Sequence, residues 1–125
     1  MSLWLAIMLG GALGSAGRYA LSLFMSAKLG PDFPYGTLSV NVIGCLLIGL
    51  LGALMSGAWT PREELRLAIL IGGLGGFTTF SSFGADALSL IDQGRWSAAM
   101  LYISLTNLAA LLAVWMGTRL GRMIG

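Results

Sequence analysis

Four long apolar stretches separated by short polar segments dominate the chain. The stretches cover approximately residues 3–27, 37–59, 65–91 and 96–120. Each is close to the length of about 20 residues that an α-helix needs to cross the hydrocarbon core of a bilayer. The segments between them carry the prolines and most of the charges, as turns do. The pattern predicts an all-α membrane protein in which residues 1–125 form a single domain of four transmembrane helices.

The third stretch has a centre that disfavours a continuous helix. Residues 72–83 read GGLGGFTTFSSF, in which four glycines precede two threonines and two serines. A glycine inside a helix costs roughly 1 kcal/mol relative to alanine, so we expect a break near residues 75–79. Backbone freed from its helical hydrogen bonds at membrane depth is tolerated only where it is buried in protein or lines a wet path. The broken helix therefore predicts an ion site.

Composition excludes several classes of function. Of the 125 residues, 57% are hydrophobic and 10% are charged, and the mean hydropathy is +0.87. The chain has no histidine and a single cysteine, Cys45, so it lacks the usual ligands of a zinc site. Its net charge of +2 comes from scattered Lys and Arg residues, which do not form the basic patch of a nucleic-acid-binding protein. Neither a phosphate-binding loop nor an acid–base constellation is present, so we expect a protein that is not an enzyme.

Two polar side chains stand out inside the apolar stretches. Arg18 lies well inside the first one, where a guanidinium costs at least ~2.5 kcal/mol unless it finds partners. It could reach out to the interface, join helices or line an anion pathway. Asn41 lies near the start of the second stretch and should point into the bundle, either as a donor to an ion or as a hydrogen bond between helices.

The segment after the predicted break combines aromatic rings with hydroxyl groups. Phe80 and Phe83 are three residues apart and share a helix face, and Thr79, Ser81 and Ser82 add hydroxyl donors. Because an aromatic ring is electropositive at its edge, two rings presented edge-on suit an anion that must bind weakly enough to leave. Exposed main-chain carbonyls in the break would instead attract a hard cation. By itself, such an aromatic pair is also common in ordinary packing.

The distribution of basic residues gives only a weak preference for one orientation. Arg62, Arg66, Arg119 and Arg122 would lie at one end of the bundle, against Lys28 and Arg95 at the other. Cytoplasmic loops normally carry a clear excess of Lys and Arg. A chain with so small a bias can insert both ways and pair antiparallel with a copy of itself.

Taken together, these motifs resemble those of the Fluc (CrcB-type) family of small fluoride channels. The run GGFTTFSSF at residues 75–83, GGALG at 10–14, Arg18-Tyr19, and GTL at 36–38 before Asn41 carry the resemblance, which extends over essentially the whole chain. It implies an antiparallel, dual-topology homodimer in a prokaryotic inner membrane, with two fluoride pores and a structural sodium ion at the centre of the interface. The implied function is passive export of fluoride, which protects the cell from fluoride toxicity.

The resemblance also implies roles for individual residues. The main-chain carbonyls of Gly75 and Thr78 would bind the sodium ion. The fluoride pathway would contain eight residues, namely Asn41, Phe80, Phe83, Ser81, Thr79, Thr37, Thr106 and Arg18. Ala110, one helical turn beyond Thr106, replaces an expected hydroxyl group, which predicts a thinner polar track on the fourth helix.

Two other classes of protein compete with this interpretation. A small multidrug-type antiporter would need a membrane-embedded carboxylate in its substrate path, but the first two stretches have none and Asp86 lies toward the end of the third. A structural or assembly subunit would explain the glycines as packing residues. It would not explain the hydroxyl-rich break or the paired phenylalanines.

Overall fold

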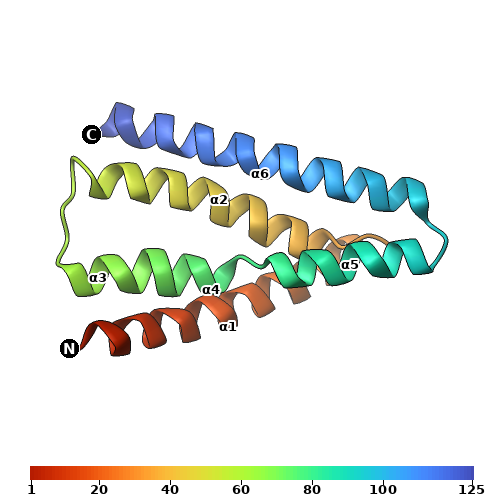
Figure 1. The fold of residues 1–125 in the computed structure, drawn as a ribbon, viewed down its shortest axis with the longest axis horizontal. Coiled ribbons are helices and arrows are strands. Elements are labelled where there is room, and N and C mark those ends of the chain that lie inside the picture. The colour runs from red at the N-terminus through yellow and green to blue at the C-terminus, as the bar shows by residue number, and fades with distance from the viewer.

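The computed structural model describes all 125 residues, and every regular element is helical. In chain order the elements are α1 (Leu3–Leu29), α2 (Tyr35–Met55), α3 (Glu63–Leu67), the π-helix η1 (Ala68–Leu74), α4 (Gly75–Phe77), α5 (Phe80–Asp92) and α6 (Trp96–Ile124). The elements from α3 to α5 follow one another along one line, so the chain forms a bundle of four rods in which consecutive rods run in opposite directions (Figure 1). The prediction of an all-α protein with four long helical segments is confirmed.

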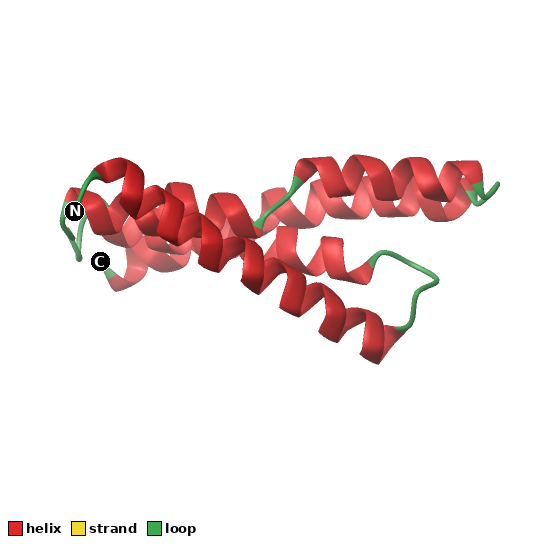
Figure 2. Cartoon of the chain, turned by 90° about the horizontal axis from the view of Figure 1, so that it is seen from below, coloured by secondary structure: helices red, strands yellow, loops and turns green.

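The bundle is compact at one end and divided at the other. The N- and C-termini lie together at one end, beside the loop between α2 and α3 (Figure 1). At the opposite end, the hairpin of α1 and α2 diverges from the hairpin of α5 and α6 (Figure 2). The interrupted third rod connects the two regions, with its break near the middle of the bundle (Figure 1).

Three helical segments are long and apolar enough to cross a membrane, namely Tyr35–Met55, Glu63–Asp92 and Trp96–Ile124. The first of the four predicted spans, α1, is not among them; it has the length but carries Arg18, Lys28, four glycines and three serines. Only 19 of the 125 residues are buried, and many large apolar side chains face outward. Such a surface suits contact with lipid or with other protein. The chain is therefore an integral, multi-pass membrane protein.

Some helix ends differ from their predicted positions. The second helix ends at Met55 instead of residue 59, because the chain turns there and the amides of Gly57 and Trp59 both donate to the carbonyl of Leu54. The fourth helix continues to Ile124 instead of residue 120, since no proline interrupts it. The third rod begins at Glu63, after Pro61.

Glycines bring the helix backbones into close contact. A Cβ atom at Gly10 would lie 2.0 Å from the carbonyl oxygen of Ala68, and one at Gly14 would lie 2.0 Å from that of Gly73. On the other side of the bundle, a Cβ atom at Gly117 of α6 would lie 2.2 Å from the carbonyl oxygen of Leu46 of α2. Any larger side chain at these positions would push the helices apart.

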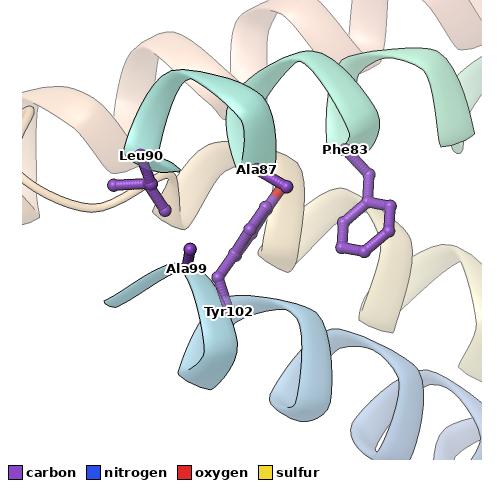
Figure 3. Packing of buried hydrophobic residues seen from close by; sticks show 5 residues of the cluster. All are labelled: Phe83, Ala87, Leu90, Ala99 and Tyr102. Carbon is purple, nitrogen blue, oxygen red and sulfur yellow. The ribbon is translucent and has the colours of Figure 1, made fainter. Parts of the chain in front are cut away.

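A small buried cluster joins α5 to α6. Tyr102 extends from α6 across to α5, where Phe83, Ala87 and Leu90 line the contact (Figure 3). Both Tyr102 and Ala99 are completely buried. This cluster positions the helix that carries the paired phenylalanines.

Candidate functional site

The third rod is interrupted at two residues only. Thr78 (φ −82°, ψ 159°) and Thr79 (φ −154°, ψ 121°) have extended backbones between α4 and α5. Both lie within the predicted interval 75–79, but the prediction that the backbone unwinds from Gly75 onward is wrong, because Gly75–Phe77 is a helical turn. The glycine-rich segment before it widens into the π-helix η1 instead of breaking. Its backbone packs directly on α1, which holds it in a helical path.

Asn41 of α2 holds the extended segment through two hydrogen bonds. The amide of Thr79 donates to Asn41 Oδ1 at 2.8 Å, and Asn41 Nδ2 donates to the Thr79 carbonyl oxygen at 3.0 Å. The hydroxyl of Thr79 then accepts the amide of Ser82 at 3.1 Å and so caps α5. These bonds fix the point where α5 begins and the direction in which Phe80 leaves the backbone.

The same bonds leave two carbonyl oxygens free for other ligands. The amide of Thr79, the helical partner of the Gly75 carbonyl, donates to Asn41 instead. The Thr78 carbonyl accepts no hydrogen bond from the chain. Main-chain oxygens without partners are the ligands that a hard cation prefers, and Gly75 is exposed on the single chain. The carbonyl oxygens of Gly75 and Thr78 are therefore suitable ligands for a sodium ion. One chain supplies too few such oxygens to complete a sodium site.

An open groove of about 400 Å³ runs beside the break. It is lined by Asn41, Cys45, Gly75, Thr78, Thr79, Phe80, Phe83, Thr106, Asn107, Ala110 and Leu111. The groove brings together seven of the ten residues assigned to the two ion sites from the sequence. Ala110, one helical turn beyond Thr106, also lines the groove and supplies no hydroxyl group there, whereas the neighbouring Asn107 adds an amide.

The groove combines aromatic rings with a hydroxyl group that lacks a partner. The ring centroids of Phe80 and Phe83 are 5.5 Å apart with an angle of 46° between the planes. Phe83 is buried (8% exposed), whereas Phe80 is 81% exposed on the single chain. Thr106 is 6% exposed, and its Oγ1 atom has no hydrogen-bond partner. Since a buried hydroxyl normally finds a partner, Thr106 is available to a ligand in the groove.

Three residues predicted for the pathway lie outside the groove lining. Ser81 is exposed and its Oγ lies 3.3 Å from Thr79 Oγ1, at the edge of the groove. Thr37 donates to Asp86 Oδ2 at 2.6 Å. Arg18 donates from Nε to the carbonyl oxygen of Gly76 at 3.1 Å, on the side of the break that faces α1.

Sequence reasoning did not predict the polar contact around Asp86. Both Thr37 and Tyr102 donate to Asp86 Oδ2, at 2.6 Å and 3.2 Å. The signal was present, because Asp86 is the only carboxylate between residues 65 and 91 and a carboxylate in such a segment needs partners. The ring centroids of Tyr102 and Phe83 are 5.2 Å apart. Because Phe83 lines the groove, the polar contact around Asp86 lies next to the groove.

The chain offers no conventional metal centre, since no group of three or more His, Cys, Asp or Glu side chains could hold a metal ion. What the groove provides is an uncharged lining of aromatic rings, which are electropositive at their edges, together with hydroxyl groups and the two side-chain amides of Asn41 and Asn107. Such a lining can accept a small anion without trapping it, as permeation requires.

Comparison with known proteins places the chain in a family. Residues 5–118 match the family described as CrcB-like protein, Camphor Resistance (CrcB). A fluoride-specific ion channel FluC from Chloroflexus aurantiacus is 45% identical over 121 residues, which cover 97% of this chain and 96% of the relative. Similar proteins with the same name come from Magnetococcus marinus (45% over 121 residues, 97% of each chain) and Agrobacterium fabrum (44% over 113 residues, 90% of each chain).

The matches extend over nearly the full length of both partners, and the relatives share one name. We conclude that this chain belongs to the CrcB-type family of fluoride ion channels, a family of channels and not of enzymes.

Proposed function

We propose that this protein is a fluoride-selective channel that passively exports fluoride from the cytoplasm and so protects the cell against fluoride. The groove beside the break carries the proposal, because two phenylalanine rings and a buried threonine hydroxyl without a partner line the same groove. An anion in the groove would meet electropositive ring edges and hydroxyl groups but no full positive charge. This balance supports passage instead of tight binding.

Each residue of the pathway has a role that its position allows. Phe80 and Phe83 of α5 contribute ring edges, and the hydroxyl of Thr106 of α6 donates to the ion. An amide nitrogen carries two N–H groups, and Asn41 uses one on Thr79, which leaves the second for fluoride. Thr79 and Ser81 supply hydroxyl groups at the edge of the groove. Thr37 and Arg18 lie further out and act indirectly, through Asp86 and Gly76.

The functional unit is an antiparallel homodimer with dual topology in the plasma (inner) membrane of a prokaryote. On one chain, the groove is open and Phe80 is 81% exposed. The backbone next to this ring carries carbonyl groups without hydrogen-bond partners, and such groups are not tolerated in contact with lipid. This face should therefore be covered by protein. A second copy related by a two-fold axis would cover this face and close one pore on each side.

A structural sodium ion at the centre of the dimer would be held by the carbonyl oxygens of Gly75 and Thr78 from both copies. Two oxygens per chain become four in the dimer, and none of them is used in a hydrogen bond within the chain. When bound, the ion supplies positive charge that stabilises the free ends of the two interrupted helices.

Fluoride efflux from liposomes tests the proposed function directly. Vesicles loaded with fluoride and reconstituted with the purified protein should release it much faster than empty vesicles, while chloride efflux stays at background. Phe80→Ile should lower fluoride efflux by about tenfold or more, or about 1.4 kcal/mol of barrier, and still elute as the wild type does.

Phe24→Ile is the matched control, because Phe24 is exposed on α1 and does not line the groove. It should retain the wild-type rate. Wild-type vesicles that release fluoride no faster than empty ones would show that the proposed function is wrong, and equal chloride efflux would refute the selectivity.

A further inference from the structure

Arg18 is the one charged residue near the middle of α1, and its surroundings are unusual for an anion-attracting group. It is half-buried and does not line the groove. No carboxylate lies in salt-bridge distance, since the only ion pair of the chain joins Arg62 to Glu64. The hydrogen bond of its side chain goes to a main-chain oxygen, the carbonyl of Gly76, at 3.1 Å.

The carbonyl of Gly76 lies at the end of a helical segment. α4 ends at Phe77, and Thr78 and Thr79 are extended, so the last carbonyl groups of this segment have lost their partners in the following turn. The end of a helix carries a partial negative charge, which a cationic side chain stabilises. The guanidinium therefore caps the interrupted helix.

The position of Arg18 relative to this carbonyl is set by close backbone packing. A Cβ atom at Gly14 would lie 3.0 Å from the amide nitrogen of Phe77, and one at Gly17 would lie 3.6 Å from the ring of Phe77. A Cβ atom at Gly76 would lie 3.0 Å from the carbonyl oxygen of Gly11. Since α1 and α4 pack closely, the Arg18 side chain leaves α1 beside the end of α4, where its Nε reaches the Gly76 carbonyl.

A second group, on another helix, holds the break as well. Asn41 of α2 binds both the amide and the carbonyl of Thr79, whereas Arg18 of α1 binds the carbonyl of Gly76. Between these two anchors lies Thr78, and immediately after them comes Phe80. Arg18 and the groove lining thus occupy different sides of the same short segment.

We propose that Arg18 is a positioning residue of the channel: it holds the end of α4 through the Gly76 carbonyl and thereby fixes the direction of the Thr78 carbonyl and the Phe80 ring, instead of attracting fluoride at the pore mouth. This inference rests on the proposed fluoride channel. It predicts that the hydrogen bond to Gly76 matters more than the charge of the side chain.

The test compares Arg18→Ala, Arg18→Gln and Arg18→Lys, with Arg119→Ala as the control. Gln has an N–H donor at the place of Arg Nε but no charge, whereas Lys keeps the charge and has a methylene group at that place, with its donors one atom further out. Arg119 lies on Trp115, far from the break in sequence. One readout is the dependence of efflux on fluoride concentration. The other is the rate at which methyl methanethiosulfonate modifies Cys45, followed by mass spectrometry, because Cys45 lines the groove beside Thr78.

We expect Arg18→Ala to lower the maximal fluoride efflux at least tenfold and to raise the Cys45 modification rate at least threefold, while the half-saturating fluoride concentration stays unchanged. Arg18→Gln should recover most of both effects, and Arg119→Ala should behave as the wild type. Any one of three results would overturn the proposal. The first is efflux in Arg18→Gln as low as in Arg18→Ala, the second is wild-type efflux in Arg18→Lys, and the third is a higher half-saturating fluoride concentration in the neutral variants. Unchanged Cys45 reactivity in Arg18→Ala would overturn it as well, even in a protein that conducts no fluoride, so its failure is distinguishable from that of the proposed function.

Discussion

Glycine has two distinct roles on α2, and only one of them concerns the break. A Cβ atom at Gly44 would lie 2.2 Å from Thr78 Cγ2 and 3.3 Å from the ring of Phe77. The missing side chain thus makes room for the extended segment. At Gly52, on the same helix, no atom lies within 4 Å of the position of a Cβ atom. The sequence alone does not distinguish these two residues, because both occur in the same apolar stretch.

Gly44→Ala should destabilise the protein by about 1–3 kcal/mol, the usual cost of overpacking. Because the new methyl group would displace Thr78, fluoride efflux should fall as well. Gly52→Ala, the matched control, should leave efflux unchanged and stabilise the helix by roughly 0.5–1 kcal/mol. Thermal unfolding in detergent and liposome efflux measure both effects, and equal stability of the two variants would contradict the packing argument.

At the scale of elements, Tyr102 connects α6 to the helix that carries Phe83. Its ring makes an edge contact with Phe33 at 5.5 Å and a tilted contact with Phe83 at 5.2 Å. Its hydroxyl donates to Asp86 Oδ2 at 3.2 Å, and Thr37 of α2 donates to the same oxygen. Three helices therefore meet at Asp86, which places α5 relative to α2 and α6.

Removing the Tyr102 hydroxyl and removing its ring should have different costs. Tyr102→Phe loses one hydrogen bond and should lower the free energy of unfolding by about 1 kcal/mol, since Thr37 still donates to Asp86. Tyr102→Ala leaves a cavity in a fully buried cluster and should cost about 3–5 kcal/mol. Chemical unfolding in detergent can compare them, and a similar loss in both variants would show that the hydroxyl, not the ring, joins the helices.

At the scale of the whole molecule, the basic residues are only modestly biased toward one end. The end with the termini carries Arg62, Arg66, Arg119 and Arg122, and the opposite end carries Lys28 and Arg95. The bias set by positive residues is therefore small. A dimer of antiparallel copies needs both orientations in the same membrane, which this balance permits.

A protease-cleavable tag after Gly125 should be accessible from both faces of the membrane in comparable amounts. Adding three lysines next to the tag should shift the population toward a cytoplasmic C-terminus and reduce fluoride efflux, since fewer antiparallel pairs can form. Protease protection in oriented vesicles measures the two populations. A tag found on a single face in the unmodified protein would contradict dual topology.

The helical segments and the approximate position of the break could be predicted because their causes are local. A segment of about 20 apolar residues forms a helix in a membrane whatever surrounds it, and glycine and threonine lower helix stability wherever they occur. By contrast, the exact break at Thr78 and Thr79 depends on α1, whose packing keeps the preceding glycines helical.

The partners of the polar side chains were decided by the tertiary structure. Asn41 bonds to Thr79, Thr37 to Asp86 and Arg18 to Gly76, across 38, 49 and 58 positions of the sequence. Which groups meet at such distances depends on the rotation and depth of each helix, and these follow from where glycines let backbones touch. The sequence by itself determined that polar groups must find partners inside an apolar bundle. Only the packing of the helices decided that Asn41 and Arg18 each donate a hydrogen bond to the backbone around the break, while the Thr106 hydroxyl has no partner in the groove.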